Sequence, residues 1–180
     1  MAVSRLEASG GEVQNAKDTF YELLRSRIAA GNLERTIVVR GQTRPGVLVE
    51  ENELVTTATL PDCFRLRWTA AGVDTANALP LVALGCEILY ETAGSAENGG
   101  MDRGRALAAM DAELTAAINA SPQFAAKQNY AGLASGGGVV AMNTNVWWGN
   151  VVFGAAVGKG DRVARTATVT VMSYEEAGEL

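Results

Sequence analysis

Carboxylates, arginines and two cysteines are the reactive side chains that this sequence offers, because it contains no histidine. Without histidine, Ser-His-Asp and Cys-His nucleophilic systems, most catalytic zinc sites and histidine-based acid/base catalysis are excluded. Cys63 and Cys86 lie far apart in the sequence and fit neither a zinc spacing nor a disulfide framework. We therefore expect two buried thiols in a reducing compartment, and a protein that is not an enzyme.

The carboxylates do not predict a shared site. Glu87 and Glu91 fall on one face of a predicted strand, where paired carboxylates would suit magnesium binding or acid/base catalysis. Four residues of strand separate them by about 13 Å, so the two groups cannot meet, and we expect solvated surface carboxylates. The sequence therefore predicts no catalytic residue and no metal ligand.

Two glycine-rich segments lack the context that phosphate binding requires. "GKGD" (158–161) is shorter than a phosphate-binding loop and precedes a predicted strand instead of a helix N-terminus. "SGGGVV" (135–140) has no strand-turn-helix setting around it. We expect a hairpin turn with a solvated lysine, a flexible loop, and no cofactor.

Arginines at the start of a predicted helix indicate a contact elsewhere. Arg103 and Arg105 lie in its first turn, where the helix dipole disfavours cations. Arginines in that position often form an ion pair with a carboxylate in the same chain or in a neighbouring subunit. We take both as candidate subunit-interface residues. Asp111, further along this helix, is expected to pair with Arg65 or Arg67.

Trp147 and Trp148 stand side by side on a predicted strand. Successive side chains of a strand point to opposite faces, so one ring is expected in the core and the other on the far face. That second ring is covered either by another segment of this chain or by a neighbouring subunit. Since tryptophan is enriched at interface hot spots, both are candidate interface residues.

The elements that position these residues follow from hydrophobic periodicity. Apolar residues at three- and four-residue steps predict helices over 11–30 and 102–119, with Asp102 as N-cap of the second. Ser121-Pro122 either ends this second helix or restarts a short helix through Phe124 and Ala125. Predicted strands cover 35–41, 46–50, 53–60, 62–70 and 79–92, with a tight turn at Glu51-Asn52, followed by strands 145–157 and 162–176 that flank the "GKGD" turn. The predicted class is α+β: a largely antiparallel, mixed β-sheet, two main helices packed on one face, and a long C-terminal β-hairpin.

The length of 180 residues predicts a single domain over 1–180, with a flexible arm at 1–10 and flexible loops at 94–100 and 129–144. The net charge of −5 and the absence of a basic stripe argue against tight nucleic-acid binding. No apolar run approaches the roughly 18 residues of a membrane span, and the start has no signal-peptide pattern. We expect a protein made in the cytoplasm that contacts no membrane.

The order of these elements resembles the tail terminator and minor tail (neck) proteins of tailed bacteriophages. The resemblance is carried by "CEILYETAG" (86–94), "GRALAAMDAEL" (104–114) and the hairpin "NVWWGNVVFGAAV…RTATVTVMSY" (145–174), within a pattern over most of 11–174. It implies a virion protein, made in the bacterial host's cytoplasm, that assembles into a homohexameric ring capping the tail tube.

The resemblance also implies partners. They are further copies of the chain, the tail tube protein, a neck or connector protein and, where one exists, the sheath. DNA would only pass through the lumen, which an acidic protein suits because negative walls do not hold phosphates. The alternatives are another neck or tail-completion protein, the cap of a contractile injection system, or a small cytosolic enzyme or ligand-binding domain with a pocket between helix and sheet.

Overall fold

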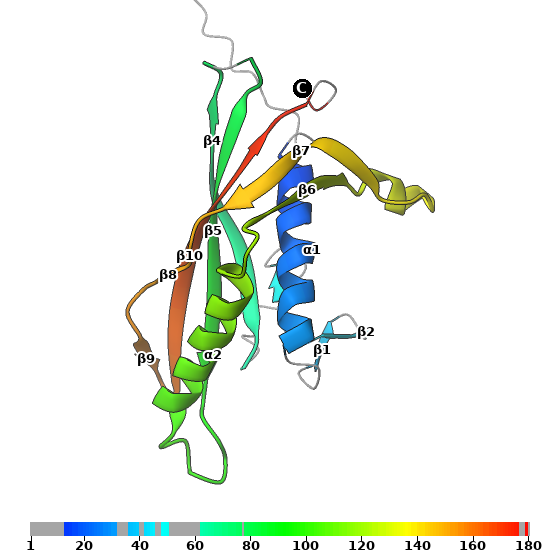
Figure 1. Ribbon diagram of the computed structural model, residues 1–180. Helices are drawn as coiled ribbons and strands as arrows, with labels where there is room; N and C mark the ends of the chain where they lie inside the picture. The colour runs from blue at the N-terminus through cyan, green and yellow to red at the C-terminus, as the bar shows by residue number, and fades with distance from the viewer. Residues whose placement is uncertain are drawn as a thin grey trace, which may run out of the picture.

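The computed structural model describes residues 13–31, 36–39, 42–45, 48–50, 62–76, 78–176 and 179. Within these residues, two α-helices pack on one face of an eight-stranded sheet, as Figure 1 shows. The elements are α1 (Gln14–Gly31), β1 (Thr36–Val39), β2 (Gln42–Pro45), β3 (Leu48–Glu50), β4 (Phe64–Asp74), β5 (Leu81–Thr92), α2 (Arg103–Ile118), β6 (Phe124–Asn129), the 3₁₀ helix η2 (Ala131–Ser135), β7 (Val140–Trp148), β8 (Val152–Phe153), β9 (Val157–Lys159) and β10 (Arg162–Tyr174). The predicted α+β class is confirmed.

The sheet has the order β3-β4-β5-β10-β7-β6, and β8 and β9 also pair with β10. β10 runs antiparallel to β5 over its whole length, from Val163 opposite Thr92 to Tyr174 opposite Leu81. β3 and β4 are parallel, so the sheet is mixed as predicted. A separate β1–β2 hairpin completes the described strands, and its second strand was not predicted.

The core lies between the helices and one face of the sheet. Alternation along the strands places Phe64, Leu66, Leu84 and Ile88 on that face, and all four side chains are fully buried. The apolar stripes of the two helices cover them, through Ala16, Phe20, Leu24 and Ile28 of α1 and Leu107, Met110 and Leu114 of α2. The predicted helical periodicity therefore marks the buried faces correctly.

Residues 124–144 differ from the prediction. The short helix expected at Phe124 and Ala125 is the start of β6, because these residues pair across the sheet with Trp147 and Val146 of β7. The loop expected at 129–144 contains η2 and the first part of β7. Cross-strand partners distant in sequence decide this segment, and a local pattern does not contain them.

The predicted C-terminal hairpin is present, but its first strand is interrupted. The "GKGD" turn joins β9 to β10, and Gly160 adopts a left-handed φ of 63° there. Between Trp148 and Val157 the regular ladder to β10 is reduced to β8, flanked by single backbone bonds from the Gly149 and Gly154 amides to the Thr170 and Thr166 carbonyls. Glycine weakens a strand interior, which accounts for the breaks.

Some predictions fall on other parts of the chain. Three predicted features lie outside the described residues: the flexible N-terminal segment at 1–10, the turn at Glu51-Asn52 and the strand at 53–60. The segment 94–100 forms consecutive turns closed by backbone hydrogen bonds, with the Gly100 amide donating to the Ser95 carbonyl at 3.0 Å.

Candidate assembly surface

Trp148 is the core-facing member of the tryptophan pair. Its side chain is 5% exposed, its ring meets that of Phe20 edge-on at 5.5 Å, and its indole Nε1 donates to the Ile118 carbonyl at 2.9 Å. The guanidinium of Arg27 lies 5.1 Å from the centre of the indole ring. Trp148 thus ties β7 to the last residue of α2 and to α1.

Trp147 lies on the opposite face of the sheet, as strand alternation predicts. It is half-buried, and its ring lies 5.4 Å from that of Tyr174. Its cross-strand partners are Phe124 on β6 and Met172 on β10. Phe124 is 54% exposed, so this aromatic pair reaches the surface that the two helices leave uncovered.

The register extends this pair into a row across the sheet. The row, called here the Trp147 row, consists of the successive cross-strand partners Phe124, Trp147, Met172, Ala83 and Gly72, on β6, β7, β10, β5 and β4. None of the five carries a charge, and three of them present a large apolar side chain. The row is a neutral strip with an aromatic end and a flat end of small residues.

The next rows of the same face change from neutral to charged. Thr170 and Gly85 are cross-strand partners beside the Trp147 row. Further along, Arg67 of β4 bonds to Glu87 of β5 through Nε at 3.2 Å, in a partly exposed ion pair. The open face is therefore divided into a neutral part and a charged part.

The segment that connects β6 to β7 forms a second surface without charged residues. The sequence contains no Asp, Glu, Lys or Arg from 128 to 158, in a chain where 19% of residues are charged. The segment 129–144, called here the arm, extends past α1 and away from the sheet (Figure 1). Its exposed apolar side chains are Leu133, Val139 and Val140, with exposed fractions of 54%, 43% and 63%.

The base of the arm is fixed to the body of the protein. The Thr19 hydroxyl of α1 accepts from the Gln128 amide at 2.9 Å, and the Glu176 carboxylate accepts from the Thr144 amide at 2.6 Å and from Asn143 at 3.1 Å. Burial alone would raise the pKa of Glu176, but the hydrogen bonds from Thr144 and Asn143 outweigh it and hold the pKa below its usual value.

A buried ion pair lies beneath this base. Lys127 is fully buried, and its Nζ donates to the Tyr174 carbonyl and to the Glu179 carboxylate, both at 2.6 Å. Glu179 also accepts from the Asn15 amide group at 2.8 Å. Burial opposes ionisation of Glu179, yet its bonds to Lys127 and Asn15 lower its pKa. The pair joins α1, β6 and the C-terminal segment.

The structure does not bring the candidate arginines to the tryptophans. Arg103 folds back on the preceding loop, where its Nε donates to the Gly100 carbonyl at 2.7 Å, and Arg105 is exposed. The N-terminal end of α2 lies at the opposite end of the molecule from the arm (Figure 1). An interface through these arginines would be distinct from one through Trp147.

Asp102 is the N-cap residue of α2, as predicted, but its side chain makes no capping hydrogen bond. Its carboxylate instead accepts from the Ser95 amide at 2.9 Å and from Asn98 at 3.2 Å, and the first of these bonds lowers its pKa. The closed loop 95–102 satisfies the carboxylate, because its turns direct amide groups toward it.

The pairing predicted for Asp111 with Arg65 or Arg67 is wrong. Asp111 forms an ion pair with Arg165 of β10 and accepts from the Tyr90 hydroxyl. The pKa of Tyr90 is raised, chiefly by burial and then by its bond to Asp111. Arg165 lies on the helix-facing side of β10, toward α2. The register of β10 in the sheet therefore brings Arg165, and not Arg65 or Arg67, to Asp111.

Glu91 is also not solvated as expected. It is 5% exposed and pairs with Arg162, and with Lys159 at 3.4 Å. Lys159 is the lysine of "GKGD", which therefore neutralises a carboxylate of β5. Cys63 and Cys86 are both buried and are not joined in a disulfide.

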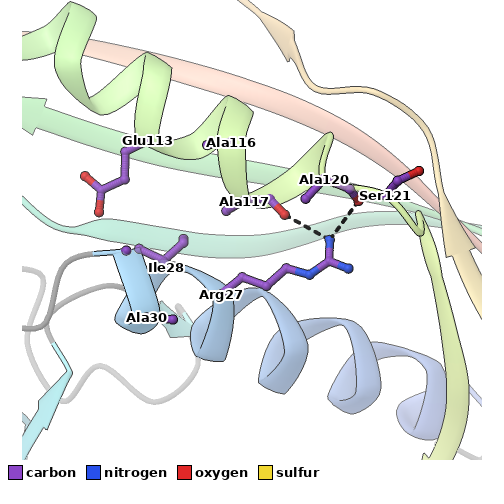
Figure 2. A pocket seen from close by; sticks show the side chains of 9 residues that line it. Arg27, Ile28, Ala30, Glu113, Ala116, Ala117, Ala120 and Ser121 are labelled. Atoms are coloured by element: carbon purple, nitrogen blue, oxygen red, sulfur yellow. Dashed lines mark hydrogen bonds between the residues drawn. The ribbon is translucent and has the colours of Figure 1, made fainter.

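A groove of about 570 Å³ lies between the C-terminal ends of α1 and α2 (Figure 2). Arg27 crosses it, and its guanidinium donates to the carbonyls of Ala117 and Ala120 at 3.0 and 3.3 Å, and to that of Pro122 at 2.9 Å. Arg27 and Glu113 are the ionisable side chains that line it. The groove lies between two helices, whereas the ligand-binding alternative placed its pocket between helix and sheet.

The described ranges of the chain contain neither a cluster of metal-ligand side chains nor a membrane-spanning helix. No group of three or more His, Cys, Asp and Glu side chains gathers there as metal ligands would. None of the described helices is long and apolar enough to cross a membrane.

Searches against protein-family models and curated proteins find no match. Among solved structures, the chain is similar to one described as "Virion of native gene transfer agent (GTA) particle", with 13% sequence identity and a TM-score of 0.32. The similarity covers 94% of this chain and 99% of that one. The function proposed below rests on the surface of this chain.

Proposed function

We propose that this protein is a structural subunit of a bacteriophage tail, namely the tail terminator, whose ring caps the tail tube and joins it to the head-neck connector. The observation that carries the proposal is the neutral surface: the stretch 128–158 contains no charged residue, and much of it is exposed. An assembly role explains why so long an exposed stretch has neither sign of charge.

The composition of this surface suits contact with another protein subunit. The centres of protein interfaces are depleted of charged residues and enriched in aromatic residues and methionine. Exposed apolar patches on soluble proteins mark interaction sites. Trp147, Met172 and Phe124 on one surface have the composition of an interface, with Phe124 exposed and the other two half-buried. Leu133 and Val140 on the other surface are exposed apolar side chains. A closed ring requires two different patches on each subunit, and this chain has two.

The proposal includes the absence of catalysis. The chain lacks histidine, and the carboxylates that sequence analysis singled out as reactive groups are engaged within the fold. Glu87 bonds to Arg67, Glu91 to Arg162 and Asp111 to Arg165. Such pairs stabilise a fold and leave none of these three carboxylates poised as a general acid or base.

Mass measurement in solution, followed by addition to tail tubes, tests the proposal. We expect self-association at high protein concentration or on tube ends, and an arrest of tube elongation when the protein is added to polymerising tube subunits. Particle reconstruction would then place the protein at the upper end of the tail. A strict monomer that saturates with a small ligand and leaves tube elongation unchanged would overturn the proposal.

Two alternatives give different results in the same experiments. Another neck or tail-completion protein, or the cap of a contractile injection system, would assemble but occupy a different position in its particle. A small ligand-binding domain would use the groove between α1 and α2, which is large enough for a small molecule. In that case Arg27→Ala would abolish ligand binding, and replacement of the arm would not.

A further inference from the structure

We propose that the arm of one subunit lies across the Trp147 row of the next subunit, with Leu133, Val139 and Val140 covering Trp147, Met172 and Ala83. This inference rests on the proposed function, since it assigns the two patches by which one copy of the chain binds another. It commits the arm to a second copy of this chain and not to a different protein.

The absence of charge on both the arm and the Trp147 row favours contact between them. The arm carries no cation for a nucleic acid and no ionic group for a charged protein surface. On the open face of the sheet, the Trp147 row and the Thr170–Gly85 pair beside it are uncharged. Asp74 lies on this face at the end of β4, and the far end carries the Arg67–Glu87 and Arg162–Glu91 pairs. Docking the arm on the charged part would remove water from the ionic groups without supplying other hydrogen-bond partners for them, which costs free energy. The neutral arm therefore matches the neutral row.

Shape supports the same assignment. Ala83 and Gly72 give one part of the open face little side-chain relief, so a backbone segment can approach it closely, whereas the Thr69 side chain already covers Gly85. Trp147 and Phe124 stand at the other end as large aromatic anchors, the residue types that dominate interface energetics. A neutral hairpin with three branched apolar side chains fits a strip of this form.

The arm is also preorganised. Its base is fixed by the hydrogen bonds of Thr19 to Gln128 and of Glu176 to Thr144 and Asn143. Docking therefore orders few additional residues, which reduces the entropic cost of association. The arm and the row are two different patches of the subunit, so their contact can repeat from one subunit to the next, as a ring requires.

Site-directed cysteines test this contact. Cys63 and Cys86 are buried, so Leu133→Cys on the arm and Ala83→Cys on the row supply the accessible thiols of each variant. The two single variants are mixed in equal amounts under conditions where the wild type associates, treated with a mild oxidant and separated by denaturing electrophoresis. Ala108→Cys, at an exposed position of α2, replaces either partner as the matched control.

The expected result is a cross-linked dimer in the Leu133→Cys and Ala83→Cys mixture, at least fivefold stronger than with either variant alone or with Ala108→Cys. A chain with both Leu133→Cys and Ala83→Cys should give a ladder of oligomers. Cross-linking of Leu133→Cys alone, or none at all while the wild type still associates, would overturn this inference and leave the proposed function standing. A wild type that stays monomeric even with tail tubes would overturn both.

Discussion

At the scale of single residues, the two adjacent tryptophans lie in different environments and make different contacts. Trp148 uses its ring in the core and its indole N–H on the last carbonyl of α2, at Ile118. Trp147 lies on the other face between Met172 and Phe124, where no helix covers it. The two should therefore respond to substitution in different ways.

Trp148→Ala should lower the free energy of unfolding by about 3–5 kcal/mol, the cost of removing a buried large aromatic side chain. Trp147→Ala should cost far less stability, and should weaken self-association by about 2 kcal/mol, or roughly 30-fold, as for an interface hot spot. Chemical denaturation measures the free energy of unfolding, and sedimentation velocity measures self-association. Trp148→Phe is the control that removes the N–H donor but keeps most of the packing. Equal loss of stability in both alanine variants would contradict the interface role of Trp147.

Glu179 should make stability depend on acid pH. Its pKa is lowered in the folded protein, so the unfolded chain binds protons more readily as the pH falls. The stabilisation is therefore present above the ordinary pKa of about 4.5 and is lost as the pH falls below it. Glu179→Gln, which leaves Lys127 buried without its anion, should cost about 3–5 kcal/mol at pH 7.

The difference between wild type and Glu179→Gln should shrink steadily as the pH falls from about 4.5 toward 3. Urea denaturation at a series of pH values measures this difference. Glu22→Gln is the control, because Glu22 pairs with Arg25 on an exposed helix face and should show little effect at any pH. A constant difference across the acid range would show that ionisation of Glu179 does not stabilise the fold.

At the scale of elements, the C-terminal end of α2 is held by other elements. Arg27 of α1 donates to three carbonyls in the segment 117–122, Trp148 donates to Ile118, and the Val151 amide donates to Asn119 at 3.1 Å. The bonds to Ala117 and Ile118 satisfy carbonyls that the helix end leaves open, the Val151 amide bonds to the side-chain oxygen of Asn119, and Arg27 places a cation where the helix dipole is negative. Burial lowers the pKa of Arg27, and the carbonyls that surround it replace water as its partners.

Arg27→Ala should therefore lower the free energy of unfolding by about 1–3 kcal/mol. The matched control is Arg25→Ala two residues earlier on the same helix, whose ion pair with Glu22 is partly exposed and contributes about 0.5 kcal/mol or less. Thermal and urea denaturation of the two variants provide the comparison. Equal effects would mean that the carbonyl contacts of Arg27 contribute little.

The arm is the element whose removal separates assembly from folding. Asn129 and Val140 are cross-strand partners, so an Asn-Gly turn replacing 130–139 would close β6 and β7 into a two-residue hairpin. We expect a protein that unfolds cooperatively within about 1 kcal/mol of the wild type, because much of the removed segment is exposed. Sedimentation should show a monomer where the wild type associates. Normal association of this variant would exclude the arm from the interface.

At the scale of the whole molecule, neutral and charged surfaces predict different responses to salt. The arm and the Trp147 row carry no charge, whereas Arg103 and Arg105 would need an ion pair with a neighbour. Ion pairs at a surface are screened by salt, and apolar contacts are not.

Association through the arm should therefore change by less than about threefold in dissociation constant between about 0.05 and about 0.5 M sodium chloride. Arg105→Ala should leave it unchanged. Sedimentation equilibrium over this salt range measures the constant directly. Strong weakening by salt, together with loss of association in Arg105→Ala, would place the interface at the start of α2 instead.

Sequence patterns predicted the parts of this fold that depend on local periodicity. The stripe containing Phe20, Leu24 and Ile28, and the alternation of Phe64 and Leu66, follow from residue types at short spacing. The predictions for Phe124, Ala125 and 129–144 failed, because these segments take their conformation from β7 and α1, which are distant in sequence. Burial of a lysine at 127 was likewise not predicted, since its anion lies far along the chain at Glu179.

The sequence by itself determined the α+β class, the buried helix faces, the placement of Trp147 and Trp148 on opposite sides of one strand, and the uncharged stretch 128–158. Only the tertiary structure decided that Trp148 is the inner ring, that Arg165 pairs with Asp111, and that part of the uncharged stretch, 129–144, projects as an arm. The reason is physical. Periodicity fixes which side chains share a face of one element, whereas strand register and helix packing fix which elements those faces meet.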